Sequence, residues 1–204
     1  MTVRVDRRAQ RHSPLEHRAA ELAALRGQAR LVEEPFLAQQ NLRTDAAEAG
    51  GMRLPGPNRV TGDEHRAALW LGPDEWLLIG VTAGTEHRSA VDVSAARTTL
   101  RLRGPAAREV LAALCSLDLH PRVFGPGQVA QTSIARAQVV LWQLDAEPTY
   151  RLLVRNSFAE HLAAALLDAI HHLGAAAPAF PSGTTSADDL AAGPDVLHNE
   201  EQFG

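Results

Sequence analysis

Asp92, Ser94 and His120 are residues whose types could form a nucleophilic triad in this 204-residue chain. In a triad, a histidine takes the proton of a serine hydroxyl and a carboxylate orients the imidazole, so geometry rather than sequence order defines the site. The sequence contains no Gly-x-Ser-x-Gly elbow that would present a nucleophilic serine. Asp118 and His120 alternate at the end of a short extended segment, which favours a structural Asp–His hydrogen bond. We therefore expect no catalytic serine.

The histidines and the single cysteine lack the spacing of a metal site. His161 lies about three helical turns before His171 and His172, and adjacent histidines on a helix point in different directions. Cys115 stands in an apolar helical run, as buried and inert thiols do. The Gly-Pro-Gly at 125–127 is not a phosphate cradle, because proline removes a backbone donor, and without any lysine no Schiff base can form. We expect no catalytic, cofactor-binding or metal-binding residue in this chain.

A predicted strand at 98–103 alternates apolar residues with a face formed by Arg97, Thr99, Arg101 and Arg103. Two interpretations of this face are open. The charges can protect an exposed sheet edge against aggregation, or the planar guanidinium groups can dock on the carboxylates of a partner protein. The three arginines are therefore candidate subunit-interface residues.

Two apolar segments around a Gly-Pro-Asp-Glu turn predict a β-hairpin over 67–80. If the turn closes symmetrically, Leu71 pairs with Trp76, and Trp70 points to the face opposite Trp76. Neither face is polar, so helices, another sheet or another protein must cover both. We expect one tryptophan in the core and the other under a second sheet or a partner, which makes both candidate interface residues. The expected faces are Leu69, Leu71, Trp76 and Leu78 on one side, and Trp70, Leu77 and Ile79 on the other.

The remaining patterns indicate an α+β protein with mainly antiparallel sheets and a few packed helices. Capping-box spacing predicts helices that begin at Ser13 and Ser157, and Gly104-Pro105 opens a third helix. The helices at 105–114 and 158–173 are expected to cover one face of the hairpin. The stretch 45–63 is rich in Ala, Gly and Pro and is expected to be a loop. Further strands are expected at 36–43, 91–93, 129–136, 138–144 and 150–155.

Composition limits the partners and the organisation of the chain. The formal net charge is −4 and no basic stripe with interleaved aromatics is present, so nucleic acid is not an expected partner. No apolar run approaches the ~20 residues of a membrane span, so we expect no membrane partner and a cytoplasmic location. We predict a flexible arm at 1–12, a globular domain at 13–174 and a disordered acidic tail at 175–204.

Several short segments occur in a characteristic order between Ser13 and Leu173. The two most specific are the tryptophan hairpin and Leu-Asp-Leu-His-Pro at 117–121. The others are 13–15, 35–43, 91–94 and 152–159. In order and composition, these segments resemble the gamma-subunit family of heterotetrameric sarcosine oxidases. A weaker similarity, carried by 92–94 and 100–107, relates the chain to the folate-binding fold of glycine-cleavage T-proteins, but no folate ligand can be matched residue by residue.

The resemblance implies a non-catalytic gamma subunit of a flavin-dependent complex. Complexes of that family demethylate sarcosine oxidatively to glycine, with release of hydrogen peroxide and transfer of a one-carbon unit to tetrahydrofolate. The resemblance also implies that FAD, FMN, NAD, zinc and tetrahydrofolate belong to the other subunits, so that this chain binds no cofactor. Its expected partners are the alpha, beta and delta subunits.

Two other functions stay open at this point. One is a stand-alone folate-binding protein of the T-protein type, which the low aromatic content of 4% disfavours because such pockets are usually rich in aromatic residues. The other is the gamma component of a related N-methyl amine oxidase or dehydrogenase. Substrate choice would then reside in another chain.

Overall fold

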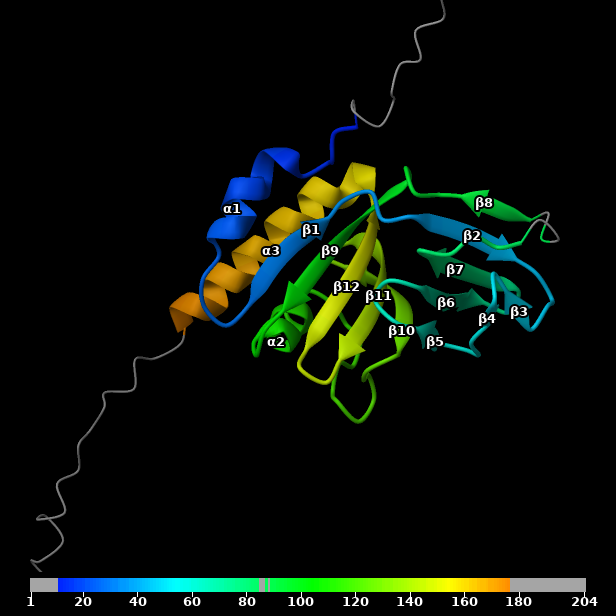
Figure 1. Ribbon diagram of the computed structural model, residues 1–204. Helices are drawn as coiled ribbons and strands as arrows, with labels where there is room; N and C mark the ends of the chain where they lie inside the picture. Colours follow the sequence, from blue (N-terminus) through cyan, green and yellow to red (C-terminus); the bar gives the residue numbers. More distant parts are fainter. Residues whose placement is uncertain (1–10, 85–86, 88, 177–204) are drawn as a thin grey trace, which may run out of the picture.

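Two five-stranded antiparallel sheets form the framework of the chain (Figure 1), so the predicted α+β class is confirmed. The computed structural model describes residues 11–84, 87 and 89–176. Most of the predicted arm at 1–12 and of the predicted tail at 175–204 lies outside these residues, so the division of the chain stays a prediction. No helix of the described part is long and apolar enough to cross a membrane.

Both large sheets combine strands that follow one another in the chain with strands from distant segments. In spatial order, the first sheet consists of β1 (Arg30–Glu34), β9 (Arg97–Arg103), β12 (Thr149–Arg155), β11 (Ala137–Asp145) and β10 (Val129–Ile134). The second sheet consists of β5 (Val60–Gly62), β6 (Ala67–Gly72), β7 (Glu75–Ile79), β2 (Gln39–Arg43) and β8 (Ala90–Asp92). A separate small hairpin joins β3 (Glu48–Ala49) to β4 (Met52–Arg53).

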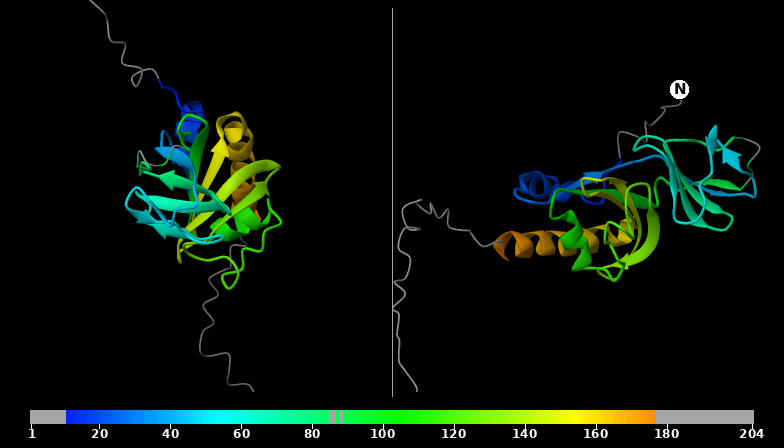
Figure 2. Two further views of the ribbon diagram at one scale, coloured as in Figure 1. Left: turned by 90° about the vertical axis from the view of Figure 1, so that its right-hand side faces the viewer. Right: turned by 90° about the horizontal axis from the view of Figure 1, so that it is seen from below.

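The helices cover the first sheet, on the side away from the second sheet (Figures 1 and 2). The prediction that they cover the hairpin is therefore wrong. Their apolar stripes meet the apolar side of β9, β11 and β12, where Leu100, Leu141 and Leu152 are fully buried beside Leu162 and Leu166 of α3. The helical elements are a 3₁₀ turn (Glu16–Arg18), α1 (Ala19–Ala24), α2 (Ala107–Ala112) and α3 (Asn156–Ala176).

Both predicted capping boxes are wrong. The first helical turn starts at Glu16. The Ser13 hydroxyl accepts the backbone N–H of Leu15 at 3.3 Å and donates to the Glu33 carboxylate, while the Glu16 carboxylate pairs with His12 and does not complete the box. α3 already begins at Asn156, so Ser157 is an ordinary helical residue. These helices are stabilised by packing of their apolar faces, from which most helical stability in proteins comes.

The predicted hairpin is confirmed as β6 and β7, but its predicted register is wrong. Trp70 pairs with Trp76, and Gly72 pairs with Glu75. Leu71 is left as the extra residue of a β-bulge between these two pairs. Because a shift of one residue moves every side chain of a strand to the other face, both tryptophans point to the same side of the sheet.

The two faces of the hairpin are covered in different ways. Leu69, Leu71, Leu77 and Ile79 pack on the first sheet. The tryptophan face packs under the stretch 45–63, which forms β3, β4 and β5 and so is not a plain loop. The residues that cover the tryptophan side include Ala49, Leu54 and Ala83.

The first strand of the chain, β1, is absent from the expected strands. Its sequence is Arg-Leu-Val-Glu-Glu, and only Leu31 is fully buried, so it shows no clear alternation. The strand expected at 36–43 begins later, at Gln39, because Phe36 has φ 59 in the connection from β1 to β2. The expected strands at 91–93, 98–103, 129–136, 138–144 and 150–155 are confirmed as β8, β9, β10, β11 and β12, with slightly different ends.

Gly62 ends β5 in a conformation that other residues rarely adopt, with φ +106. A Cβ atom there would lie 2.0 Å from the backbone oxygen of Arg66 across the turn that joins β5 to β6. We expect Gly62→Ala to lower the free energy of unfolding by at least about 2 kcal/mol, as measured by urea denaturation. Gly56→Ala is the matched control, because nothing lies within 4 Å of its Cβ position. Equal stabilities of the two variants would contradict the prediction.

Candidate functional site

The face of the first sheet that turns toward the second sheet carries three pairs of arginines at directly opposed positions. Arg30 of β1 pairs with Arg103 of β9. Two further pairs join β9 to β12, namely Arg101 with Arg151 and Arg97 with Arg155. Like charges at opposed positions of a sheet are destabilising, so a pair without compensating groups lowers stability.

The central pair is compensated by two carboxylates, and we call Glu34, Glu64, Arg101 and Arg151 the inter-sheet charge cluster. Glu34 contacts both arginines, with 2.6 Å from Oε1 to Nη2 of Arg101 and 2.6 Å from Oε2 to Nε of Arg151. Glu64 lies 2.6 Å from the same Nη2 of Arg101. The Arg151 side chain is only 4% exposed and lies over the Trp142 ring, 5.4 Å from its centroid. The four side chains therefore form ion pairs with one another within the chain.

The turn between β5 and β6 brings Glu64 to the cluster. Asp63 holds this turn, because its Oδ1 accepts hydrogen bonds from the backbone N–H groups of His65, at 2.8 Å, and Arg66, at 3.0 Å. The backbone oxygen of Glu64 also accepts a hydrogen bond from Arg151. The second sheet is thus joined to the first by charged groups as well as by the apolar contacts of the hairpin.

The Arg101 hydrogen bond holds the pKa of the Glu64 carboxyl below its ordinary value of 4.5. The unfolded chain therefore binds this proton first, so the contribution of Glu64 to stability is complete above about pH 4.5 and is lost as the pH falls through the lowered folded pKa. As the pH is lowered below about 4.5, we expect the free energy of unfolding of Glu64→Gln to decrease less steeply than that of the wild type. Denaturation curves at pH 3–7 would test this, with exposed Glu48→Gln as control; identical slopes in wild type and Glu64→Gln would contradict it.

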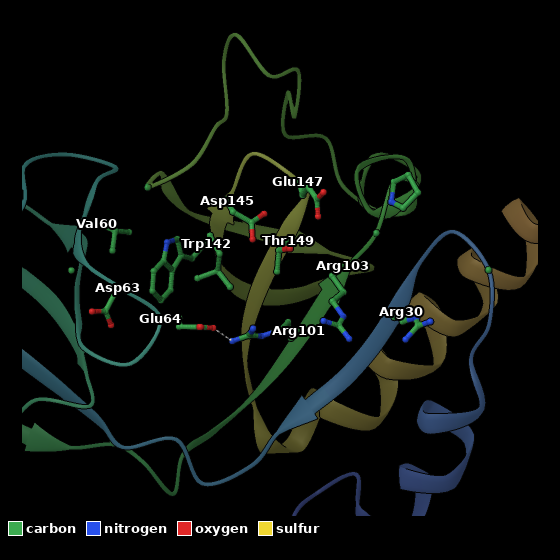
Figure 3. A pocket seen from close by; sticks show the side chains of 16 residues that line it. Arg30, Val60, Asp63, Glu64, Arg101, Arg103, Trp142, Asp145, Glu147 and Thr149 are labelled. Atoms are coloured by element: carbon green, nitrogen blue, oxygen red, sulfur yellow. Dashed lines mark hydrogen bonds and ion pairs between the residues drawn. The ribbon is translucent and has the colours of Figure 1, made fainter.

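The Arg30–Arg103 pair differs from the central pair, because both side chains are exposed and neither has a hydrogen bond or ion pair to another described residue. They line a cavity of about 740 Å³ between the sheets (Figure 3). Asp145 and Glu147 stand on the neighbouring wall, and Trp142 also lines the cavity.

The candidate residues Arg97, Arg101 and Arg103 thus have different surroundings. The interpretation of a charged sheet edge is wrong, because β9 lies between β1 and β12. Arg101 forms ion pairs with Glu34 and Glu64 of the same chain. Arg97 is partly buried, and this burial lowers its pKa. Arg103 is exposed at the cavity. Sequence reasoning missed Arg30, Arg151, Glu34 and Glu64 as members of this face.

The candidate residues Trp70 and Trp76 lie together on the outer face of the hairpin. Trp76 is 7% exposed, and its indole Nε1–H donates a 3.0 Å hydrogen bond to the backbone oxygen of Pro55. Trp70 is partly buried beside it. The cover of this face comes from the chain itself, and the role of either tryptophan in an interface stays a prediction.

The groups that could form a triad have structural hydrogen bonds. The Ser94 hydroxyl donates to Asp92 at 2.6 Å and accepts the backbone N–H of Gln39 at 2.9 Å, which fastens the end of β8 to β2. Asp118 accepts the backbone N–H of His120, not its ring. The expected Asp–His contact is therefore a backbone turn.

The described part of the chain brings together no cluster of metal ligands, and its free thiol, Cys115, is partly buried. Residues 11–84, 87 and 89–176 contain no group of three or more potential His, Cys, Asp or Glu ligands. Burial raises the pKa of the Cys115 thiol. A raised pKa keeps the group protonated, and a thiol is a much weaker nucleophile than a thiolate.

The fold and this face define an α+β protein of two stacked antiparallel sheets, in which Glu64 joins the sheets through Arg101 and the Arg30–Arg103 pair is exposed at the cavity. The model of the sarcosine oxidase gamma subunit family matches residues 37–172. The chain belongs to this family.

Individual relatives agree with the family model over most of the chain. The sarcosine oxidase subunit gamma of Corynebacterium sp. (strain U-96) is 38% identical over 191 residues, which cover 81% of this chain and 93% of the relative. The subunit gamma of Corynebacterium sp. (strain P-1) is 37% identical over 183 residues, or 78% of this chain and 90% of the relative.

A solved structure gives the same result for the fold. A chain of the heterotetrameric sarcosine oxidase from Corynebacterium sp. U-96, in complex with pyrrole 2-carboxylate, superposes with a TM-score of 0.74 at 37% identity, covering 83% of this chain and all of that chain. The glycine cleavage system aminomethyltransferase T from Bartonella henselae reaches a TM-score of 0.46 at 16% identity, over 73% of this chain and 48% of that chain. That value is below the level at which a shared function could be argued.

Proposed function

We propose that the chain is the non-catalytic gamma subunit of a heterotetrameric, flavin-dependent sarcosine oxidase. The observation that carries this proposal is the superposition with a chain of such an assembly, which is covered over its whole length. An identity of 37% over that length is typical of proteins that keep the same fold, and a subunit must also keep the shape that its partners contact.

The distribution of polar groups supports a structural role. Within the inter-sheet charge cluster, Glu64 from the turn between β5 and β6 accepts hydrogen bonds from Arg101 and Arg151 of the first sheet. Ser94, a triad candidate, fastens the end of β8 to β2. We propose that FAD, FMN, NAD, zinc and tetrahydrofolate belong to the alpha, beta and delta subunits, and that the assembly works in the cytoplasm.

Coexpression with the cognate subunits tests the proposal. A tagged gamma chain should copurify with a yellow, flavin-containing assembly that consumes sarcosine and releases hydrogen peroxide. The chain expressed alone should be colourless and should not oxidise sarcosine. Failure of the wild-type chain to copurify with its cognate subunits would refute the proposal.

The same preparations separate the two alternatives. Saturable binding of tetrahydrofolate by the isolated chain, without copurification, would indicate a stand-alone folate-binding protein. An assembly that oxidises another N-methyl amine faster than sarcosine would indicate a related oxidase or dehydrogenase. Oxidation rates for a panel of N-methyl amines give that comparison.

A further inference from the structure

The Arg30–Arg103 pair has the same geometry as the pair at the centre of the sheet, but lacks its compensation. Both pairs join directly opposed positions of neighbouring strands on one face. At the centre, two carboxylates approach to 2.6 Å and neutralise the guanidinium groups. Arg30 and Arg103 have no such contact with any described residue, although they stand at the wall of an open cavity. The central pair therefore indicates that Arg30 and Arg103 also require a carboxylate partner.

The surroundings of the pair restrict where a negative group can lie. Asp145 and Glu147 stand on the neighbouring wall of the cavity (Figure 3), and they repel a second carboxylate there. An acidic group is therefore attracted only to the wall formed by β1 and β9.

The surface continues along β1 beyond the cavity. Val32 lies two residues after Arg30 on the same face and is 43% exposed, which is high for a valine in a sheet. β1 is the edge strand of the first sheet. An exposed apolar side chain beside two free guanidinium groups matches the composition of protein interfaces, where arginine is enriched.

We propose that Arg30 and Arg103, with Val32 beside them, are the docking point for an acidic segment of a partner subunit. This inference rests on the proposed function, since it requires the assembly. Arginine suits this role because its planar fork pairs with carboxylates through two parallel hydrogen bonds. A protein segment suits the site better than a small anion, because the two guanidinium groups are exposed and the apolar Val32 extends the surface.

The double variant Arg30→Glu/Arg103→Glu tests the inference in the coexpressed assembly. We expect its affinity for the partner subunits to fall by about a hundredfold, because like charges would then face each other across the interface. The matched control is Arg122→Glu/Arg136→Glu, which changes the net charge equally at two exposed arginines outside the cavity. The control should copurify as the wild type does.

A milder variant keeps the test independent of folding. In Arg30→Gln/Arg103→Gln, the repulsion between the two arginines disappears, so the isolated chain should keep its circular dichroism spectrum and its melting temperature or gain stability. Its affinity for the partner subunits should still fall by about tenfold, and the salt dependence of assembly should become weaker.

Three results would overturn the inference. The first is wild-type affinity of both Arg30/Arg103 variants, and the second is an equal loss in the Arg122/Arg136 control. The third is saturable binding of inorganic phosphate to the isolated wild-type chain, absent in Arg30→Glu/Arg103→Glu, together with unchanged assembly, which would assign the pair to a small anion. If the wild-type chain itself does not assemble, the proposed function fails and the inference fails with it.

Discussion

Glu34→Gln should lower the free energy of unfolding by about 3 kcal/mol, because one carboxylate compensates two arginines. Glu34 lies 2.6 Å from Arg101 and 2.6 Å from Arg151, whose side chain is 4% exposed. Arg101 keeps Glu64 as a partner, whereas Arg151 keeps only the backbone oxygen of Glu64 and the Trp142 ring. Removing one member of a buried ion pair leaves an uncompensated charge, and such changes are strongly destabilising. Urea denaturation of both chains at neutral pH gives the difference.

A control and a second variant distinguish the cost of leaving Arg151 uncompensated from the cost of losing an ordinary surface ion pair. Glu21→Gln removes an exposed pair with Arg18, which is worth ~1 kcal/mol or less. Adding Arg151→Met to Glu34→Gln should recover part of the lost stability, because the uncompensated charge is removed as well. If Glu34→Gln costs no more than Glu21→Gln, Glu34 does not compensate the buried charge of Arg151.

Trp76→Ala should cost about 3–5 kcal/mol of stability, the range found when a large aromatic side chain is removed from a core. The indole is 7% exposed, packs under the segment that contains β3 and β4, and donates a hydrogen bond to Pro55. Trp76→Phe keeps most of the packing and loses only the hydrogen bond, so its expected cost is about 1 kcal/mol. Thermal and urea unfolding of the isolated chain measure both values.

The neighbouring tryptophan provides the comparison for Trp76→Ala. Trp70 lies on the same face but is only partly buried, so Trp70→Ala should cost clearly less. A Trp70 variant that stays folded but no longer copurifies with the cognate subunits would mark an interface on this face. Equal costs for the two alanine variants would show that burial in the isolated chain does not distinguish the two positions.

Local patterns predicted much of the fold, because they depend on neighbours in sequence. The Gly-Pro-Asp-Glu turn of the hairpin and the apolar repeat of α3 are examples. The fold class and the strands from β8 to β12 follow from the same kind of pattern. β1 could not be recognised, because its two glutamates, Glu33 and Glu34, are satisfied by partners on distant segments and the strand shows no clear apolar alternation.

Contacts between distant segments explain where the predictions fail. The bulge at Leu71 shifts the register by one residue, and it places both tryptophans on one face. The sequence pattern of the hairpin is apolar on both sides, so it does not distinguish the two registers. Packing against the first sheet on one side and against the stretch 45–63 on the other selects between them.

The sequence by itself determined the fold class, most strands and the family, because periodicity and short motifs are properties of neighbouring residues. Only the tertiary structure decided the role of each arginine. Glu34 meets Arg151 across 117 positions of sequence, and Glu64 meets Arg101 across 37. No local rule pairs such groups, since the β1–β9–β12 register and the turn after β5 bring them together. The same register places Arg30 opposite Arg103, and that pair alone faces the open cavity without a carboxylate of its own among the described residues.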